Sequence, residues 1–480
     1  MRKFSLFNRR RFLQSSAALI GASTLPPVSW ASNSTDVIVI GAGLSGLYAA
    51  QLLEQVGLSV KVLEGRDRIG GRLHTLNDVP GAPEAGGQTI GPNYGRMIYV
   101  AQKAGVSLHN VNFRLGNEPV RQLIHAGGER ILPAEWATSP YNPFPQAYKT
   151  TLPDRLLNQV IGSPPLVAGN AWLKPEFAEL DYPVARLFKT KGFNQAAIDI
   201  AGISNNYGPT LEEASLLFLH RNNAIVTQSM STPGGVKIAK GGNQRVPEGM
   251  AKMLKTGIRL NSAVTQIRHA SEGYMVKCAD NSQHNARYVI AAVPFSTLRH
   301  VDLQLDLPAI QQEAIEQLAY GKVFQAHFAV EQPFWEGKGF LPNVWSDSII
   351  ERVFASDPSN TGKITNLTVW INGKGADLVA QLPPKEAEKQ ILSAFYEALP
   401  EAKGAVRFVT TYSWDSQTMS RGSFATWRPG QINRYAHVMA TPAGDLHFAG
   451  EHTARWSSGM EGALESGERA ANEIIAKLSR

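Results

Sequence analysis

The segment TDVIVIGAGLSGLYAAQLLEQVGLSVKVLE, residues 35–64, decides the fold. Its β-branched run at residues 37–40 is typical of a strand that is buried on both faces of a parallel sheet. A glycine-rich turn follows, then apolar residues at a helical spacing, a second buried strand at residues 60–63 and an acid, Glu64. This order of elements predicts a doubly wound α/β domain that binds a dinucleotide.

The three glycines of the turn are expected to do different things. Gly41 makes the tight turn, Gly43 lets the backbone approach a pyrophosphate, and Gly46 lets helix and strand pack closely. The helix N-terminus supplies unpaired N–H groups for the phosphates. Glu64, 18 residues past Gly46, is placed to accept hydrogen bonds from a ribose diol. NAD and FAD both fit this pattern.

The rest of the chain favours FAD, because four further stretches resemble the flavin amine oxidase family. They are EGRDRIGGRLHT (64–75), EAGGQTIGP (84–92), KGGNQRVPEGMAKML (240–254) and LHFAGEHTARWSSGMEGALESGERAANEI (446–474). The resemblance covers residues 36–478. It implies an α/β fold in which an FAD-binding doubly wound (Rossmann-like) domain is interleaved with an α+β substrate domain. We assign residues 36–92, 240–300 and 405–480 to the first domain, and 93–239 and 301–404 to the second.

The resemblance also implies which residues hold FAD. Ser45 and Arg66 would lie at the pyrophosphate, and the backbone of Val264 would meet the adenine edge. The residues implied beside the flavin ring and its ribityl chain are Gly71, Arg72, Gly86, Gly87, Gln88, Gly450, Glu451 and Met460. The Met460 N–H and the helix N-terminus that follows it would face the flavin C2 carbonyl, where positive potential stabilises the charge of reduced flavin.

Two departures from the family pattern concern the tether and the substrate cage. Ser423 stands where monoamine oxidases carry the cysteine that binds FAD, and the single cysteine, Cys278, lies elsewhere. We therefore expect FAD to be bound non-covalently. Phe424 matches one ring of the aromatic cage around the substrate nitrogen, but Gly459 stands at the second ring, so a half-open cage is expected. Trp456 either leans into the gap or only packs.

A third departure concerns the residues beside the flavin. Trp414 matches a family tryptophan whose apolar face excludes water. Gln325, ten residues before Trp335, stands where the family usually has a lysine that holds a water at flavin N5. Glutamine can hold a water but brings no charge, and His327 shares its face of the strand. The sequence leaves open whether O₂ or another acceptor reoxidises the flavin.

The function expected from these residues is FAD-dependent oxidative deamination of an amine. The main alternative is an L-amino acid oxidase, although Thr89 stands where that branch usually has an arginine for the substrate carboxylate; Arg96 and Arg114 are other candidates for that role. Desaturases and porphyrinogen oxidases, and a flavin-bearing binding protein without turnover, are further alternatives. With one cysteine there is no thiolate metal cluster, and no metal is expected.

The first residues of the sequence predict an export signal. NRRRFLQSSAALIGAS (8–23) joins paired arginines to a short apolar segment, and a small-x-small cleavage site follows at residues 29–31. This start resembles the twin-arginine signal, whose pathway carries folded proteins. We expect residues 1–31 to be removed and the protein to be periplasmic or secreted. Without those residues, 42 Lys and Arg (47 less five) face 40 Asp and Glu, so the charge does not indicate a nucleic-acid partner. No stable membrane insertion is expected, and the oligomeric state stays open, a homodimer included.

Overall fold

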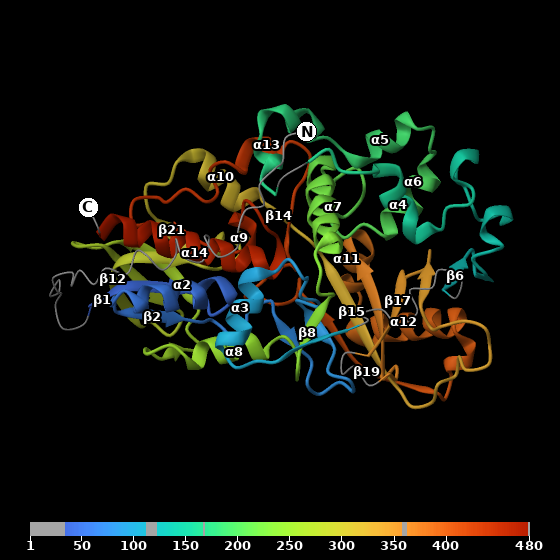
Figure 1. Cartoon of the computed structure of the whole chain (residues 1–480), viewed down its shortest axis with the longest axis horizontal. Helices are drawn as coiled ribbons and strands as arrows, with labels where there is room; N and C mark the ends of the chain where they lie inside the picture. The colour runs from blue at the N-terminus through green and yellow to red at the C-terminus, as the bar shows by residue number, and fades with distance from the viewer. Residues whose placement is uncertain (1–33, 112–121, 167–168, 358–361, 479–480) are drawn as a thin grey trace, which may run out of the picture. The chain divides into compact units, whose positions relative to one another are not determined.

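The first predicted strand lies inside an eight-stranded sheet (Figure 1). In this computed structural model, which describes residues 34–111, 122–166, 169–357 and 362–478, β1 (Ser34–Ile40) pairs in parallel with β2 (Val60–Leu63). Val37, Ile38 and Val39 are fully buried, as expected for a strand covered on both faces. The predicted signal, residues 1–31, lies outside the described residues.

The eight-stranded sheet combines a parallel part with an antiparallel hairpin. Its strands run in the spatial order β13 (Asp302–Gln304), β10 (Val264–His269), β11 (Tyr274–Cys278), β12 (Gln283–Ala291), β1, β2 and β9 (Ile258–Arg259). The last strand in the sequence, β21 (Leu446–Phe448), pairs in parallel with β12. The parallel strands confirm the doubly wound arrangement, and β10 and β11 form the hairpin.

Helices from both ends of the chain cover this sheet. α2 (Leu44–Gln55) packs against α14 (Gly459–Leu478), so that the glycine turn and the C-terminal helix meet (Figure 1). The approach is close, since a Cβ on Gly467 would lie 2.2 Å from the Ser45 carbonyl oxygen. The other helices of this part are α3 (Gly95–Lys103), α8 (Arg245–Lys252), α9 (Phe295–Leu298), α10 (Ala309–Gln317) and α13 (Gln431–Tyr435).

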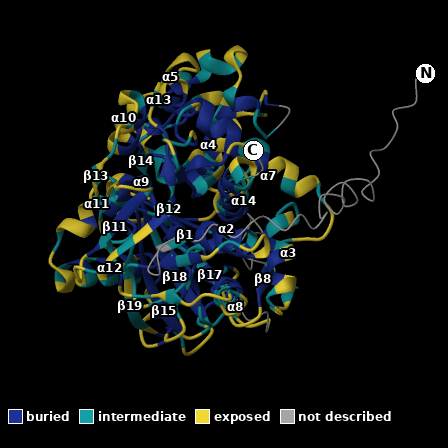
Figure 2. Ribbon diagram, turned by 90° about the vertical axis from the view of Figure 1, so that its left-hand side faces the viewer, coloured by how far each residue is buried: buried dark blue, intermediate teal, exposed yellow. Residues whose placement is uncertain are grey.

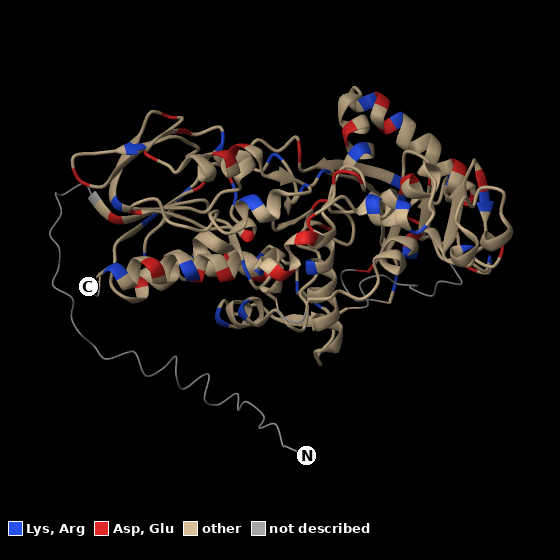
Figure 3. Cartoon of the chain, turned by 90° about the horizontal axis from the view of Figure 1, so that it is seen from above, with Lys and Arg blue, Asp and Glu red and all other residues tan. Residues whose placement is uncertain are grey.

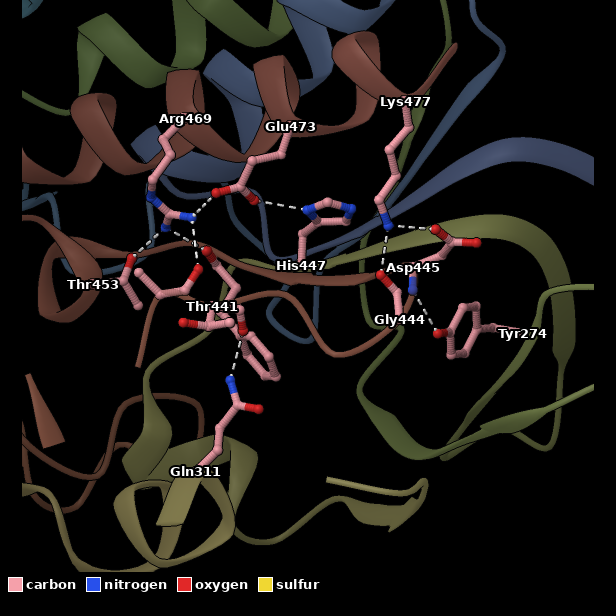
Figure 4. A network of polar contacts seen from close by, with 12 residues as sticks. Tyr274, Gln311, Thr441, Gly444, Asp445, His447, Thr453, Arg469, Glu473 and Lys477 are labelled. Carbon is pink, nitrogen blue, oxygen red and sulfur yellow. Dashed lines mark hydrogen bonds and ion pairs between the residues drawn. The ribbon is translucent and has the colours of Figure 1, made fainter. Parts of the chain in front are cut away.

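A polar network binds the second half of α14 to β21 (Figure 4). Arg469 Nη2 donates to the Phe448 carbonyl at 2.7 Å. The Glu473 carboxylate contacts Arg469 Nη1 and His447 Nδ1, each at 2.8 Å. Since Phe448 lies two residues before the turn at Gly450, the network fixes the turn on which the predicted cofactor residue Glu451 lies.

A second sheet of seven strands lies in the predicted substrate domain. Its order is β19 (Val406–Ser413), β15 (Val323–Val330), β18 (Asn366–Asn372), β17 (Arg352–Ser356), β16 (Val344–Ser346), β6 (Leu123–Ala126) and β7 (Glu129–Ile131). β19 falls within the segment 405–480 that we assigned to the FAD-binding domain, yet it pairs with β15 here. β13 falls within the segment 301–404 that we assigned to the substrate domain, yet it pairs with β10 in the first sheet. The domain boundaries stay a prediction, because the described residues from Thr35 on form one compact unit.

The remaining helices come from the segments assigned to the substrate domain. They are α4 (Pro153–Ile161), α5 (Val184–Thr190), α6 (Gln195–Ile203), α7 (Leu216–Ser231), α11 (Gly373–Gln381) and α12 (Pro384–Ala398). Three two-stranded ladders are β3 (His74–Thr75) with β4 (Glu84–Gly86), β5 (Leu108–Asn110) with β8 (Lys237–Ala239), and β14 (Ala319–Tyr320) with β20 (Ala425–Thr426). Figure 2 shows buried residues concentrated on the sheets, and Figure 3 shows both signs of charge interspersed along the helices. No described helix is long and apolar enough to cross a membrane.

Candidate active site

A cavity of about 440 Å³ starts at the carboxyl end of β1 and reaches β15 and β18 of the second sheet. Ligands of doubly wound folds bind at the carboxyl ends of the parallel strands. Most of the predicted cofactor and substrate residues line this cavity: Gly41, Gly43, Ser45, Glu64, Arg66, Gly71, Arg72, Gly86, Gly87, Gln88, Val264, Trp414, Phe424, Gly450, Glu451, Gly459 and Met460.

The geometry of the glycine turn agrees with the roles predicted for its three glycines. Gly41 has φ +107°, and a Cβ there would lie 2.8 Å from the Ala292 carbonyl oxygen. A Cβ on Gly46 would lie 2.0 Å from the Gly41 carbonyl oxygen, and Gly46 packs without lining the cavity. Gly43 differs, since it lines the cavity and a Cβ there would meet nothing within 4 Å. That open space fits a phosphate group that approaches the backbone.

The acid at the end of β2 is held in place by backbone groups. Glu64 Oε2 accepts from the Ala42 N–H at 2.8 Å, and Oε1 accepts from the Arg66 N–H at 2.9 Å. Arg66 Nη2 donates to Ser420 Oγ at 2.6 Å, and burial lowers the pKa of this arginine. Glu64 is only 3% exposed but still lines the cavity, and its contact with a ribose stays a prediction.

An ion pair also lines the cavity. Glu451 Oε1 accepts from Arg72 Nη1 at 2.9 Å and from the Ala425 N–H at 3.0 Å. Arg72 Nη1 also donates to the Ser423 carbonyl at 3.0 Å. The pair therefore connects the entry motif, the C-terminal motif and the segment that carries Phe424, three parts of the chain that are far apart in sequence.

Aromatic side chains line the cavity where the second sheet begins. Trp414 donates from Nε1 to the Ala85 carbonyl at 2.8 Å, and its ring lies against Gly86. The Phe424 ring meets Tyr207 edge to face, with centroids 6.1 Å apart. Lining residues that the sequence did not single out include Tyr94, Asn206, Tyr207 and Trp370. They come from segments without a glycine or acid motif, so no local signal marks them.

Gln325 is the predicted catalytic residue that does not line the cavity. It is fully buried on β15. Its Nε2 donates to the Ala85 carbonyl at 3.1 Å, and its Oε1 contacts His327 Nε2 at 3.0 Å. Its role of holding a water before the flavin stays a prediction. Burial lowers the pKa of His327 to about 4, so this imidazole is neutral.

Two other candidates lie away from the cavity. Trp456 is 56% exposed and does not lean into the site. Arg96, one of the arginines considered for a substrate carboxylate, donates from Nε to Glu468 at 2.8 Å and from Nη1 to Glu461 at 3.3 Å. The other, Arg114, lies outside the described residues. In the described part of the chain, no group of three or more His, Cys, Asp or Glu side chains could hold a metal ion.

Comparisons with known proteins agree with this geometry. The model of the family described as flavin containing amine oxidoreductase matches residues 44–475. Flavin-containing amine oxidase B of Mus musculus is 29% identical over 475 residues, covering 94% of this chain and 88% of that protein. The Homo sapiens amine oxidase B is 28% identical over 469 residues, again covering 94% and 88%.

Solved structures show the same fold. A putrescine oxidase bound to putrescine superposes with a TM-score of 0.75 at 25% identity, covering 92% of this chain and 99% of that one. Cyclohexylamine oxidase from Brevibacterium oxydans IH-35A gives a TM-score of 0.75 at 24% identity, covering 93% and 100%. The fold and the cavity thus define an FAD-binding oxidoreductase. More narrowly, the chain belongs to the flavin-containing amine oxidoreductase family: it is a flavin-dependent amine oxidase.

Proposed function

We propose that this enzyme oxidatively deaminates an amine with an uncharged, apolar body. The observation that carries the proposal is the aromatic wall formed by Tyr207, Trp370, Trp414 and Phe424, which all line the cavity. FAD, when bound, supplies a hydride acceptor for the carbon that bears the amine, and water then hydrolyses the imine. The side chains of the wall orient the substrate and exclude water rather than supply a strong acid or base.

The charged residues of the cavity favour an amine over an L-amino acid. Among the described lining residues, the arginines are Arg66 and Arg72, which are already bonded to Ser420 and to Glu451. A substrate carboxylate would therefore have to displace an existing partner. The lining acids Glu64 and Glu451 are engaged in the same way, so a second ammonium group on the substrate also lacks a ready partner.

An anaerobic substrate panel tests this proposal. We expect apolar primary monoamines to bleach the visible absorbance of the yellow enzyme, and L-amino acids to leave it unchanged. Stopped-flow absorbance without O₂ measures the first half of the reaction, whatever acceptor reoxidises the flavin. Bleaching by L-amino acids alone would replace the proposal with its main alternative, and bleaching by neither class would support a binding protein without turnover.

We also propose that FAD is bound without a covalent tether. Ser423 Oγ donates to the Gly321 carbonyl at 2.8 Å, and Cys278 is buried in β11 and does not line the cavity. Acid precipitation is expected to release all of the yellow colour into the supernatant. Colour that remains with the pellet after washing would show a covalent bond to the chain.

The start of the chain supports a further proposal on localisation. The paired arginines at residues 9–10 and the small residues at 29–31 support export by the twin-arginine machinery to the periplasm or beyond. An enzyme that must take up a nucleotide made in the cytoplasm benefits from export after folding. On this proposal, FAD is loaded before the signal is removed.

A further inference from the structure

The cavity lining contains a tyrosine that the sequence did not single out. Tyr94 immediately precedes α3 and lines the cavity together with Gly459 and Met460. A Cβ built on Gly459 would meet one atom beyond its own neighbours, Tyr94 Oη at 3.7 Å. The Tyr94 hydroxyl is therefore the neighbour that a side chain at position 459 would contact first.

The position of Tyr94 is fixed by bonds between two helix starts. The Glu461 carboxylate accepts from the Arg96 and Met97 N–H groups, both at 3.0 Å, in the first turn of α3. A carboxylate at a helix N-terminus is favourable because the unpaired N–H groups there carry positive potential. Since Glu461 lies two residues after Gly459 on α14, these bonds set the start of α3, and with it Tyr94, beside Gly459.

The hydroxyl at this position stays protonated. Burial, and secondarily the nearby Glu461 charge, raise the pKa of Tyr94 to about 12. Burial also raises the pKa of Tyr207, the second tyrosine of the wall. The cavity therefore presents neutral hydroxyl groups, which can both donate and accept a hydrogen bond, rather than a phenolate.

We propose that Tyr94 is a specificity-determining residue that takes the place of the side chain absent at Gly459. Its hydroxyl accepts a hydrogen bond from the substrate N–H, and its ring limits the width of the cavity opposite Phe424. This inference rests on the proposed function, because it assumes that an amine is bound between these two residues. Gly459 itself has φ +56°, a backbone conformation that favours glycine over residues with a side chain.

Binding of amines that cannot react separates this inference from catalysis. Amines with no hydrogen on the carbon next to nitrogen cannot donate a hydride, so tert-butylamine serves as a small probe and cumylamine as a bulky one. Their dissociation constants are measured from the change in the flavin spectrum, in the wild type, Tyr94→Phe and Tyr94→Ala. Tyr99→Phe is the matched control, because Tyr99 lies on α3, the helix that begins directly after Tyr94, and its side chain is 50% exposed.

The two variants are expected to differ in a defined way. Tyr94→Phe should weaken both amines about 3- to 10-fold, the loss that corresponds to one neutral hydrogen bond. Tyr94→Ala should weaken the binding of tert-butylamine as much as Tyr94→Phe does. It should also shift the ratio of the two dissociation constants at least about 5-fold in favour of cumylamine, because the cavity widens. Tyr99→Phe should match the wild type, and all variants should keep their FAD.

Other results would overturn the inference. Unchanged dissociation constants in Tyr94→Phe would show that the hydroxyl does not bind the amine. An unchanged ratio of the two constants in Tyr94→Ala would show that the ring does not limit the width of the cavity. If Tyr94→Ala loses FAD or unfolds, Tyr94→Phe still decides. Failure of the proposed function looks different: no amine would bleach the wild-type flavin in the anaerobic panel, while the binding constants would still report on Tyr94.

Discussion

Gly46→Ala is expected to lower the free energy of unfolding by about 1–3 kcal/mol or more, and to leave the purified protein depleted of FAD. The added Cβ would lie 2.0 Å from the Gly41 carbonyl oxygen and 3.1 Å from Val39 Cγ1. Both contacts are with the strand and turn on which α2 packs, so the helix start has to move away from the sheet. The thermal unfolding midpoint and the flavin-to-protein absorbance ratio measure the two effects.

Gly43→Ala is the matched control for this prediction. Gly43 has φ −81°, which alanine adopts readily, and its Cβ would meet no protein atom within 4 Å. The FAD-free protein should therefore unfold at the wild-type midpoint. FAD affinity should fall at least about 10-fold, because the methyl group would fill the space in which the pyrophosphate is expected to bind. Equal stability losses in the two variants would contradict the different roles of these glycines, and full FAD affinity in Gly43→Ala would contradict the position of the phosphates.

Glu451→Ala is expected to yield a nearly colourless protein. The substitution leaves the Arg72 guanidinium and the Ala425 N–H without their shared acceptor in the cavity lining. Each lost hydrogen bond to a charged group corresponds to about 1.5–3 kcal/mol. The measurement is the dissociation constant of FAD, obtained by titrating FAD-free protein.

Glu468→Ala provides the control for the charge change. Glu468 lies on α14, accepts a hydrogen bond from Arg96 and does not line the cavity. Removing its charge should therefore leave FAD binding unchanged. Glu451→Gln keeps an oxygen acceptor and should fall between the wild type and Glu451→Ala. Retention of FAD at the wild-type level in Glu451→Ala would mean that the Arg72–Glu451 pair does not contribute to the cofactor site.

The sequence predicts the cofactor end of the cavity better than the substrate end. Gly41, Gly43, Gly46 and Glu64 meet local requirements of the backbone, such as a positive φ, open space or a close approach, and these requirements leave a motif. Tyr207 and Trp370 meet no such requirement. Tyr207 lies between α6 and α7 and Trp370 lies on β18, so both reach the cavity through contacts between distant parts of the chain, which leave no pattern in neighbouring residues.

The hydrogen-bond partners of Gln325 could not be predicted from its position in the sequence. Its strand and its spacing to Trp335 were predicted, and β15 is indeed a strand of the second sheet. The amide of Gln325 donates to the Ala85 carbonyl, which lies on β4, 240 residues earlier in the sequence. A partner that far along the chain cannot be seen from the residues around Gln325.

The meeting of α2 with α14 sets the order in which the protein can mature. The glycine turn leaves the ribosome long before Gly450, Glu451 and Met460, which line the same cavity. A nascent chain therefore has only part of the binding site until α14 has been made, and cofactor capture has to follow the synthesis of α14. Chains that end before α14 lack the second half of the site, so retained flavin distinguishes finished molecules from truncated ones.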